Sequence, residues 1–271
     1  MIPFSDADVQ HRTFPVVNVF LIGLNALVFL YELSLGGFGL LGGGGNQAIS
    51  IFFFKWGFIP QELVSGTVYT TLAVREIHEV VTAQGVRNVP ILVQMDVAIP
   101  LPTWATIFSS MFIHGGFMHF AGNMMFLWVF GDNVEDRMGH LKYLVFYLVA
   151  GVAATFSHLA IDLHSQTPLI GASGAISGVL GAYLLLYPHN YIKALVIMYF
   201  IMVVRVRAMI LLGLWFVWQL IQGLASVGLS DQVSVAFFAH VGGFVAGLVV
   251  MAGYKLFTRQ PVWPPRRRAA G

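Results

Sequence analysis

The sequence contains no cysteine and very little charge. The missing thiols exclude disulfide bonds, thiolate catalysis and cysteine-ligated metals. Charged residues make up 10% of the 271 residues, whereas soluble domains average about 25%. So little charge cannot cover the surface of a soluble core, and the 58% hydrophobic content predicts a membrane domain instead. The net charge of +2 is too small to indicate a nucleic-acid partner.

The apolar segments predict a polytopic protein, since a membrane-spanning helix needs about 20 mostly apolar residues. Residues 1–13 carry acids and lack the basic region and cleavage site of a signal peptide, so we expect the first apolar segment to be retained. The predicted fold is all-α, a membrane bundle of six transmembrane helices. The predicted spans are 14–33, 112–131, 143–161, 169–187, 209–224 and 235–256.

A long mixed segment, residues 34–110, separates the first two spans. It contains a glycine run at 42–45, several charges between Arg75 and Arg87, and the sequence IPLP at 99–102. We expect this first loop to be interfacial and partly helical. The predicted organisation is a short cytoplasmic N-terminus at 1–13, a six-helix membrane domain at 14–257 that includes the loop, and a basic cytoplasmic tail at 258–271.

The positions of Lys and Arg predict the orientation of the spans. Residues 194–204 are apolar but only about half as long as a span, which is more typical of an interfacial or re-entrant segment. With six spans and an inside N-terminus, the two short outside loops, 162–167 and 225–234, contain no Lys or Arg. A seventh span at 194–204 would place the basic tail outside. We therefore expect both termini in the cytoplasm of a multi-pass protein in a bacterial inner membrane.

Four polar side chains reach a similar depth under this topology, in which the second, fourth and sixth spans run from outside to inside. His119 and Asn123 lie in the outer half of the second span. Ser173 lies in the first turn of the fourth span and His240 in the outer half of the sixth. A serine needs a base to take its proton, and a histidine can do so and then protonate a leaving amine. No acid lies near either residue in the spans, so we expect a dyad.

Small residues share a helix face with each member of this pair. At 100° per residue, the small face around Ser173 covers an arc of about 140°, and the one around His240 about 60°. These faces hold Gly174, Ser177, Gly178 and Gly181 on the fourth span, and Gly243 and Gly247 on the sixth. Small faces let membrane helices approach closely. His119 and Asn123, spaced i and i+4, share a face and with the Ser173 N–H offer donors for an oxyanion.

Each feature also has a structural interpretation. The pattern GxSG at 171–174 is weak alone, since glycines in a span most often serve helix packing. His240 would equally suit a structural hydrogen bond or haem ligation, and His119 and Asn123 would suit polar contacts between helices. Other polar residues are expected to lie outside the chemistry: His114 at the interface, and Glu135 with Arg137 as a solvated or structural pair at the inner surface. The set as a whole, at one depth, favours a catalytic function.

Four segments together resemble a known family, the rhomboid intramembrane serine proteases. GASGAISGVLGAY (171–183) is similar to their GxSG-bearing fourth span, and AHVGGFVAG (239–247) to their AHxxGxxxG sixth span. HGGFMHFAGN (114–123) resembles their second-span HxxxN motif, and GDNVEDRMGH (131–140) resembles an inner-loop segment containing ExR. The resemblance extends in order from about residue 104 to about residue 254, and 14–33 fits the first span.

The resemblance implies Ser173 as nucleophile, His240 as base, and His119 and Asn123 as oxyanion donors. It implies glycine packing near the site at Gly171, Gly174, Gly178, Gly243 and Gly247. It also implies cleavage of transmembrane or membrane-tethered protein substrates in the lipid bilayer, near the outer face, without metal or cofactor.

Two departures from the family concern aromatic residues. Some members carry an aromatic residue four positions after the nucleophile, packed on the catalytic histidine, where this chain has Ser177. Some carry Trp-Arg in the first loop, where Trp104 is followed by Ala105.

An inactive rhomboid-like binding protein remains the main alternative. A transporter or haem protein using His114, His119 and His240 is disfavoured, because the spans hold almost no acids away from their ends.

Overall fold

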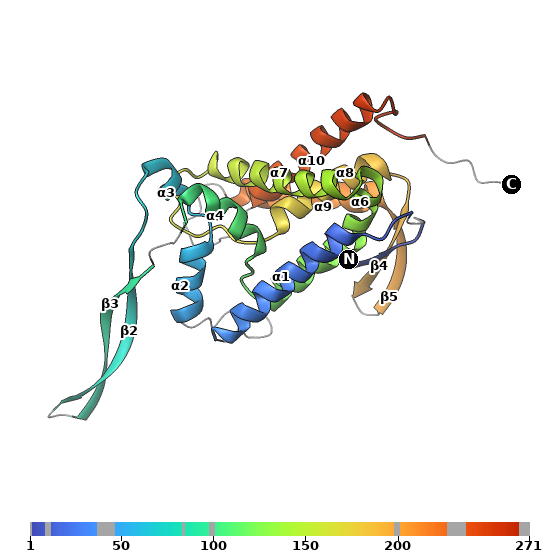
Figure 1. Ribbon diagram of the computed structural model, residues 1–271. Helices are drawn as coiled ribbons and strands as arrows, with labels where there is room; N and C mark the ends of the chain where they lie inside the picture. The colour runs from blue at the N-terminus through green and yellow to red at the C-terminus, as the bar shows by residue number, and fades with distance from the viewer. Residues whose placement is uncertain are drawn as a thin grey trace.

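The computed structural model describes residues 2–8, 12–36, 47–82, 85–97, 101–197, 201–226 and 237–265. The glycine run at 42–45, most of the predicted outside loop at 225–234 and the arginines at 266–268 lie outside the described residues. The described chain is mostly helical and includes two small sheets (Figure 1).

The elements follow one another in a simple order along the chain. The helical ones are α1 (Val16–Ser34), α2 (Gln47–Trp56), α3 (Pro60–Ser65), α4 (Thr103–Ser109), η1 (Ser110–Phe112), α5 (Phe117–Phe126), η2 (Leu127–Gly131), α6 (Asp132–Met138), α7 (His140–Leu159), α8 (Ser173–Leu186), α9 (Ala208–Ser226) and α10 (Phe237–Phe257). The strands are β1 (Ile2–Asp6), β2 (Thr71–Thr82), β3 (Gly85–Asp96), β4 (Tyr191–Ile197) and β5 (Ile201–Arg207).

Four helices of the described residues are long and apolar enough to cross a membrane, namely α1, α7, α9 and α10. Each lies within a few residues of a predicted span, so these four predictions are confirmed at the level of helix position and character. Their outward faces expose large apolar side chains such as Leu27, Val145, Leu214 and Val249. Apolar faces of this size are suited to contact with the acyl chains of a lipid bilayer and would be unfavourable in water.

The other two predicted spans differ from a plain helix. Residues 169–187 give α8, which has 14 residues and begins only at Ser173. Residues 112–131 give a helical segment that begins at Phe117 and continues to Met138 through the π-helical turn η2. The side chain of Asn18 on α1 meets this turn, because its Nδ2 donates to the Leu127 carbonyl at 2.9 Å and its Oδ1 accepts from Tyr143 at 2.8 Å. These bonds satisfy a carbonyl that the irregular turn frees inside an apolar bundle.

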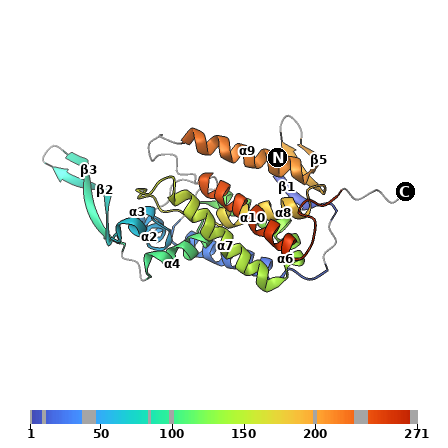
Figure 2. The same ribbon diagram turned by 90° about the horizontal axis from the view of Figure 1, so that it is seen from above.

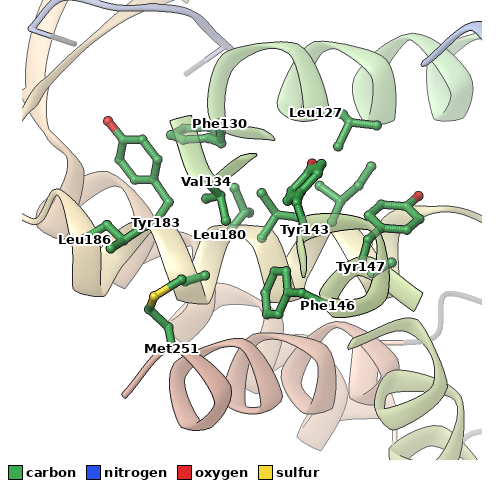
Figure 3. Close-up of a cluster of buried hydrophobic side chains, with 14 of the residues drawn as sticks. Leu127, Phe130, Val134, Tyr143, Phe146, Tyr147, Leu180, Tyr183, Leu186 and Met251 are labelled. Carbon is green, nitrogen blue, oxygen red and sulfur yellow. The ribbon is translucent and has the colours of Figure 1, made fainter. Parts of the chain in front are cut away.

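The centre of the bundle is α8. It packs against both α7 and α10, and α10 lies between α7 and α9 (Figure 2). Every α8 residue from Gly174 to Tyr183 is buried. Figure 3 shows the apolar cluster on its C-terminal half, where α8 meets η2, α6, α7 and α10. Its labelled members are Leu127, Phe130, Val134, Tyr143, Phe146, Tyr147, Leu180, Tyr183, Leu186 and Met251.

The junction of α1 with α6 is organised by Glu135 rather than by a pair of Glu135 with Arg137. Glu135 is fully buried, and its carboxylate accepts the N–H groups of Val17 at 2.9 Å and Asn18 at 2.7 Å. It thereby caps the first turn of α1, whose N-terminal dipole favours a negative charge. Arg137 instead donates to Gln260. The prediction of a structural role is met for Glu135, but the prediction of a mutual pair is wrong.

The prediction of an all-α fold is wrong at two places. Residues 194–197 fall in β4 and residues 201–204 in β5, and these strands join β1 in an antiparallel sheet of order β1-β4-β5. In the first loop, β2 and β3 form a second hairpin that projects from the bundle (Figure 1). Both segments are rich in Val and Ile, which favour strands because of their branched Cβ atoms. The first loop is also partly helical through α2, α3 and α4, as predicted.

Candidate active site

The site begins where Ser173 and His240 meet across α8 and α10. His240 Nε2 lies 2.7 Å from Ser173 Oγ, although 67 positions separate the two residues in the sequence. This distance is within the range for a hydrogen bond between a nucleophile and its base. Ser173 is the first residue of α8, so its backbone N–H has no acceptor within the helix.

Glycines allow the two helices to approach so closely. A Cβ on Gly247 would lie 2.0 Å from the Gly178 carbonyl oxygen, and one on Gly243 would lie 2.1 Å from the Gly174 oxygen. On the other side of α8, a Cβ on Gly178 would lie 2.4 Å from the Cβ of Ala150 on α7. The backbones therefore touch along the faces that the sequence analysis singled out, and this contact sets the separation of the serine and the histidine.

The chain leading into α8 is held by the first loop. Leu169 and Phe58 exchange backbone hydrogen bonds of 3.1 and 2.7 Å, and the Gly171 N–H donates to the Ser110 carbonyl at 2.9 Å. Gly171 has φ of +123°, in a region that side chains disfavour. A Cβ there would also lie 2.8 Å from the His119 ring. Gly171 thus lets the chain turn into Ser173 while the His119 ring lies against it.

His119 is oriented so that it can donate toward the site. Its Nδ1 accepts the Gly115 N–H at 3.4 Å, which leaves the ring proton of a neutral imidazole on Nε2. That Nε2 and the neighbouring Cε1 would each lie 2.8 Å from a Cβ on Gly171, and Ser173 Oγ would lie 3.5 Å from it. Asn123, one turn further along α5, is buried, and its Nδ2 has no hydrogen-bond partner among the described residues. A buried donor without a partner is costly unless a ligand supplies the acceptor.

These side chains line one cavity of about 730 Å³, a size typical of sites that enclose a ligand. The wall is formed by α5, α8 and α10 together with α2, η1, α7, α9 and the segment before α8. Ser173, His119, Asn123 and His240 all reach it, as do apolar residues such as Phe53 and Met118. The cavity therefore presents a nucleophile, a base and two candidate donors within a mostly apolar wall.

Two residues of α9 that the sequence analysis missed contact His240. Gln219 Oε1 lies 2.7 Å from His240 Nδ1, and the side chain of Gln219 is buried. The Trp215 ring lies 6.2 Å from the His240 ring, centroid to centroid, at an interplanar angle of 38°. Trp215 thus lies near the histidine where the family resemblance had suggested an aromatic residue at the position of Ser177. An amide in the middle of a strongly apolar span was the signal for Gln219.

His114 and Ser177 make hydrogen bonds that support the local fold around the site. His114 is fully buried, and its backbone N–H donates to Glu32 at 3.0 Å. Its expected position at the membrane interface stays a prediction. The buried Glu32 carboxylate holds this turn, which precedes α5 and His119. Ser177 donates its hydroxyl to the Ser173 carbonyl at 2.6 Å, within α8. Neither residue is hydrogen-bonded to Ser173 Oγ or His240 among the contacts of the described chain.

Comparison with known proteins agrees with the resemblance drawn from the motifs. A family model described as the Rhomboid domain matches residues 102–257. RHOMBOID-like protein 5 of Arabidopsis thaliana is 31% identical over 156 residues, which is 58% of this chain and 45% of that protein.

Two further relatives match shorter segments. Rhomboid protease GluP of Bacillus subtilis is 38% identical over 81 residues, 30% of this chain and 15% of that protein. Rhomboid protein 1, mitochondrial, of Saccharomyces cerevisiae is 34% identical over 88 residues, 31% of this chain and 25% of that protein. The chain thus spans less than half the length of each of these relatives. Since the family model covers more than half of the chain, the protein belongs to the rhomboid family.

Proposed function

We propose that the protein is an intramembrane serine endopeptidase that cleaves transmembrane or membrane-tethered protein substrates near the outer membrane face. The observation that carries the proposal is the 2.7 Å contact between Ser173 Oγ and His240 Nε2 in a cavity within the helical bundle. The similarity to a relative named Rhomboid protease GluP also supports the proposal. No cofactor is assigned a part in the reaction.

The chemistry would run in two stages on this pair. His240 Nε2 takes the Ser173 proton as Oγ attacks the scissile carbonyl carbon, and the carbonyl oxygen becomes an oxyanion. The C–N bond then breaks, and His240 returns the proton to the leaving amine. Water attacks the acyl-enzyme, gives a proton to His240 and releases the acid, after which Ser173 regains its proton.

Three donors would stabilise the oxyanion. The Nε2–H of His119, the Nδ2 of Asn123, which has no partner among the described residues, and the Ser173 N–H at the start of α8 all belong to residues that line the cavity. Donors that are fixed before the reaction stabilise developing charge without a cost of reorganisation. We propose His119 and Asn123 as the side-chain donors on this ground.

We also propose a topology of six membrane spans, with a membrane domain at 14–257 and both termini in the cytoplasm. The segment from α5 to α6 is 22 residues long, 117–138, which is enough to cross a bilayer. The shorter α8 covers about 21 Å at 1.5 Å per residue, so it would begin below the outer surface. The backbone pairing of Leu169 with Phe58 would satisfy the extended segment that precedes it. We propose a bacterial cell (inner) membrane as the location.

The experiment compares cleavage of a model transmembrane substrate in liposomes by wild type, Ser173→Ala and His240→Ala. Wild type should cut the substrate and both variants should not, although they insert and fold normally. Ser226→Ala, at the end of α9 and away from the cavity, should cut like wild type. Failure of well-folded wild type to cut any of a panel of substrates, while still binding them, would favour the alternative of an inactive rhomboid-like binding protein.

A further inference from the structure

The second ring nitrogen of His240 has a partner that a simple dyad lacks. A neutral imidazole has one N–H and one acceptor nitrogen. If Nε2 accepts the Ser173 hydroxyl, the ring proton is on Nδ1, and the group beside Nδ1 has to be an acceptor. Gln219 Oε1 lies there, 2.7 Å away. The two 2.7 Å contacts therefore fit the same tautomer of His240, with the proton on Nδ1. Loss of the Gln219 acceptor would allow this proton to move to Nε2, where it would prevent His240 from accepting the Ser173 proton.

Helix α9 supplies a second residue, Trp215, that limits the orientation of the His240 ring. Trp215 and Gln219 are spaced i and i+4, so they lie on one face of α9. Gln219 contacts the edge of the His240 ring at Nδ1, and the Trp215 ring lies near it at 6.2 Å. His240 itself is carried by α10 and Ser173 by α8. The base is thus positioned by a helix that carries neither member of the pair.

The character of α9 makes the Gln219 contact specific. The helix is otherwise strongly apolar, and a buried amide in such a segment is costly unless its polar atoms are hydrogen-bonded. Gln222, one turn away on the same helix, is not among the residues that line the cavity. Of the two glutamines of α9, only Gln219 is both buried and bonded to the candidate base among the described contacts.

We propose that Gln219 is a positioning residue for catalysis, which holds His240 in the tautomer and orientation that accept the Ser173 proton. The proposal rests on the assignment of Ser173 and His240 as the reacting pair. The arrangement is then a serine, a histidine and a neutral amide. An amide orients the ring as a carboxylate does in other serine hydrolases, without burying a charge beside a neutral imidazole.

The first test reads the tautomer directly and does not depend on activity. Protein with ¹⁵N-labelled histidine is examined by NMR in detergent, and the His240 signals are assigned with His240→Ala. Wild type should show a protonated Nδ1 and an unprotonated Nε2. Gln219→Met, which keeps the length of the side chain and removes the acceptor, should show a substantial fraction with the proton on Nε2. An unchanged tautomer in Gln219→Met would overturn the proposal.

The second test compares kcat and KM of Gln219→Met, Gln219→Glu and the matched control Gln222→Met. Gln219→Met should lower kcat by about 10- to 100-fold, as loss of orientation does, with KM changed less than about twofold. Gln219→Glu should recover most of this loss, because a carboxyl group offers an oxygen acceptor in either protonation state. Gln222→Met should match wild type.

The outcomes separate this proposal from the proposed function. If wild type does not cleave, the protease assignment fails, and the NMR test alone decides the role of Gln219 in holding the tautomer. If wild type cleaves and Gln219→Met has an unchanged kcat, Gln219 is not a positioning residue. A lower melting temperature with unchanged kcat per folded molecule, and no recovery in Gln219→Glu, would also contradict it, since only packing would then be affected.

Discussion

The chemistry of this site depends on how single polar residues are satisfied inside an apolar bundle. Glu135 accepts the two N–H groups at the start of α1, and Asn18 satisfies a carbonyl of η2. Asn123 is different, because its Nδ2 has no partner among the described residues. In a bilayer an unsatisfied donor is costly. Buried His114 and Glu32 also carry polar atoms without a partner in the described chain, so the proposed donor role of Asn123 rests on its place with Ser173 in the wall of the cavity.

The role of the two donors can be tested by Asn123→Ala and His119→Ala. If they stabilise an oxyanion, they act mainly in the transition state, so each variant should lower kcat by roughly 10- to 1,000-fold with little change in KM. Removal of helix contacts alone would lower the melting temperature and leave kcat per folded molecule unchanged. Measuring kcat and melting temperature on the same preparations separates these outcomes, and the second one would remove both residues from the site.

Much of the site could be predicted from the sequence, because its residues lie on regular helices. Periodicity places Gly178 and Gly247 on the faces of Ser173 and His240, and the alternation of spans predicts a common depth. Gln219 could not be paired with His240 in this way. The link joins α9 to α10, and its geometry depends on how two helices rotate against each other, which sequence spacing does not determine. The burial of His114 against Glu32 was missed for the same reason.

At the scale of elements, the contact between α8 and α10 determines whether the pair can react. The carbonyl oxygens of Gly174 and Gly178 lie where side chains on α10 would otherwise point. Since close packing replaces the hydrophobic effect as the force between membrane helices, small changes at this contact should separate Ser173 from His240.

The matched variants Gly247→Ala and Gly253→Ala test this contact on one helix. The new Cβ at position 247 would lie 2.0 Å from the Gly178 oxygen, whereas at position 253 it meets no atom within 4 Å. Gly247→Ala should destabilise the protein by about 1–3 kcal/mol, as overpacking does, and reduce cleavage. Gly253→Ala should be neutral or slightly stabilising, because alanine favours helix. Equal melting temperatures and activities for the two variants would show that the close contact has no such role.

The two sheets show where sequence reasoning was weaker at this scale. Residues 194–197 and 201–204 belong to the paired strands β4 and β5 rather than to a helical span, and their predicted interfacial or re-entrant position stays a prediction. Apolar content alone does not distinguish a short helix from a strand. The pairing of β4 with the distant β1 settles the choice, and such long-range pairing leaves no local signal.

At the scale of the whole molecule, the orientation of the spans must place Ser173 and His240 near the same surface. Reporter fusions after Tyr187 and after Leu256 should report the cytoplasmic side, and fusions within 162–167 should report the outer side. The lack of Lys and Arg in 162–167 is the physical reason for the last expectation. An outer signal after Leu256 would reverse α10 relative to α8 and contradict the proposed topology.

The most direct measurement of the central claim is the reaction of detergent-solubilised protein with a fluorophosphonate probe, followed by mapping of the modified residue by mass spectrometry. If His240 activates Ser173, wild type and Ser226→Ala should be labelled on Ser173, and Ser173→Ala should not be labelled. His240→Ala should be labelled far more slowly, because its serine lacks a base. Labelling of Ser173→Ala at the wild-type rate, or labelling of His240→Ala as fast as wild type, would contradict the account.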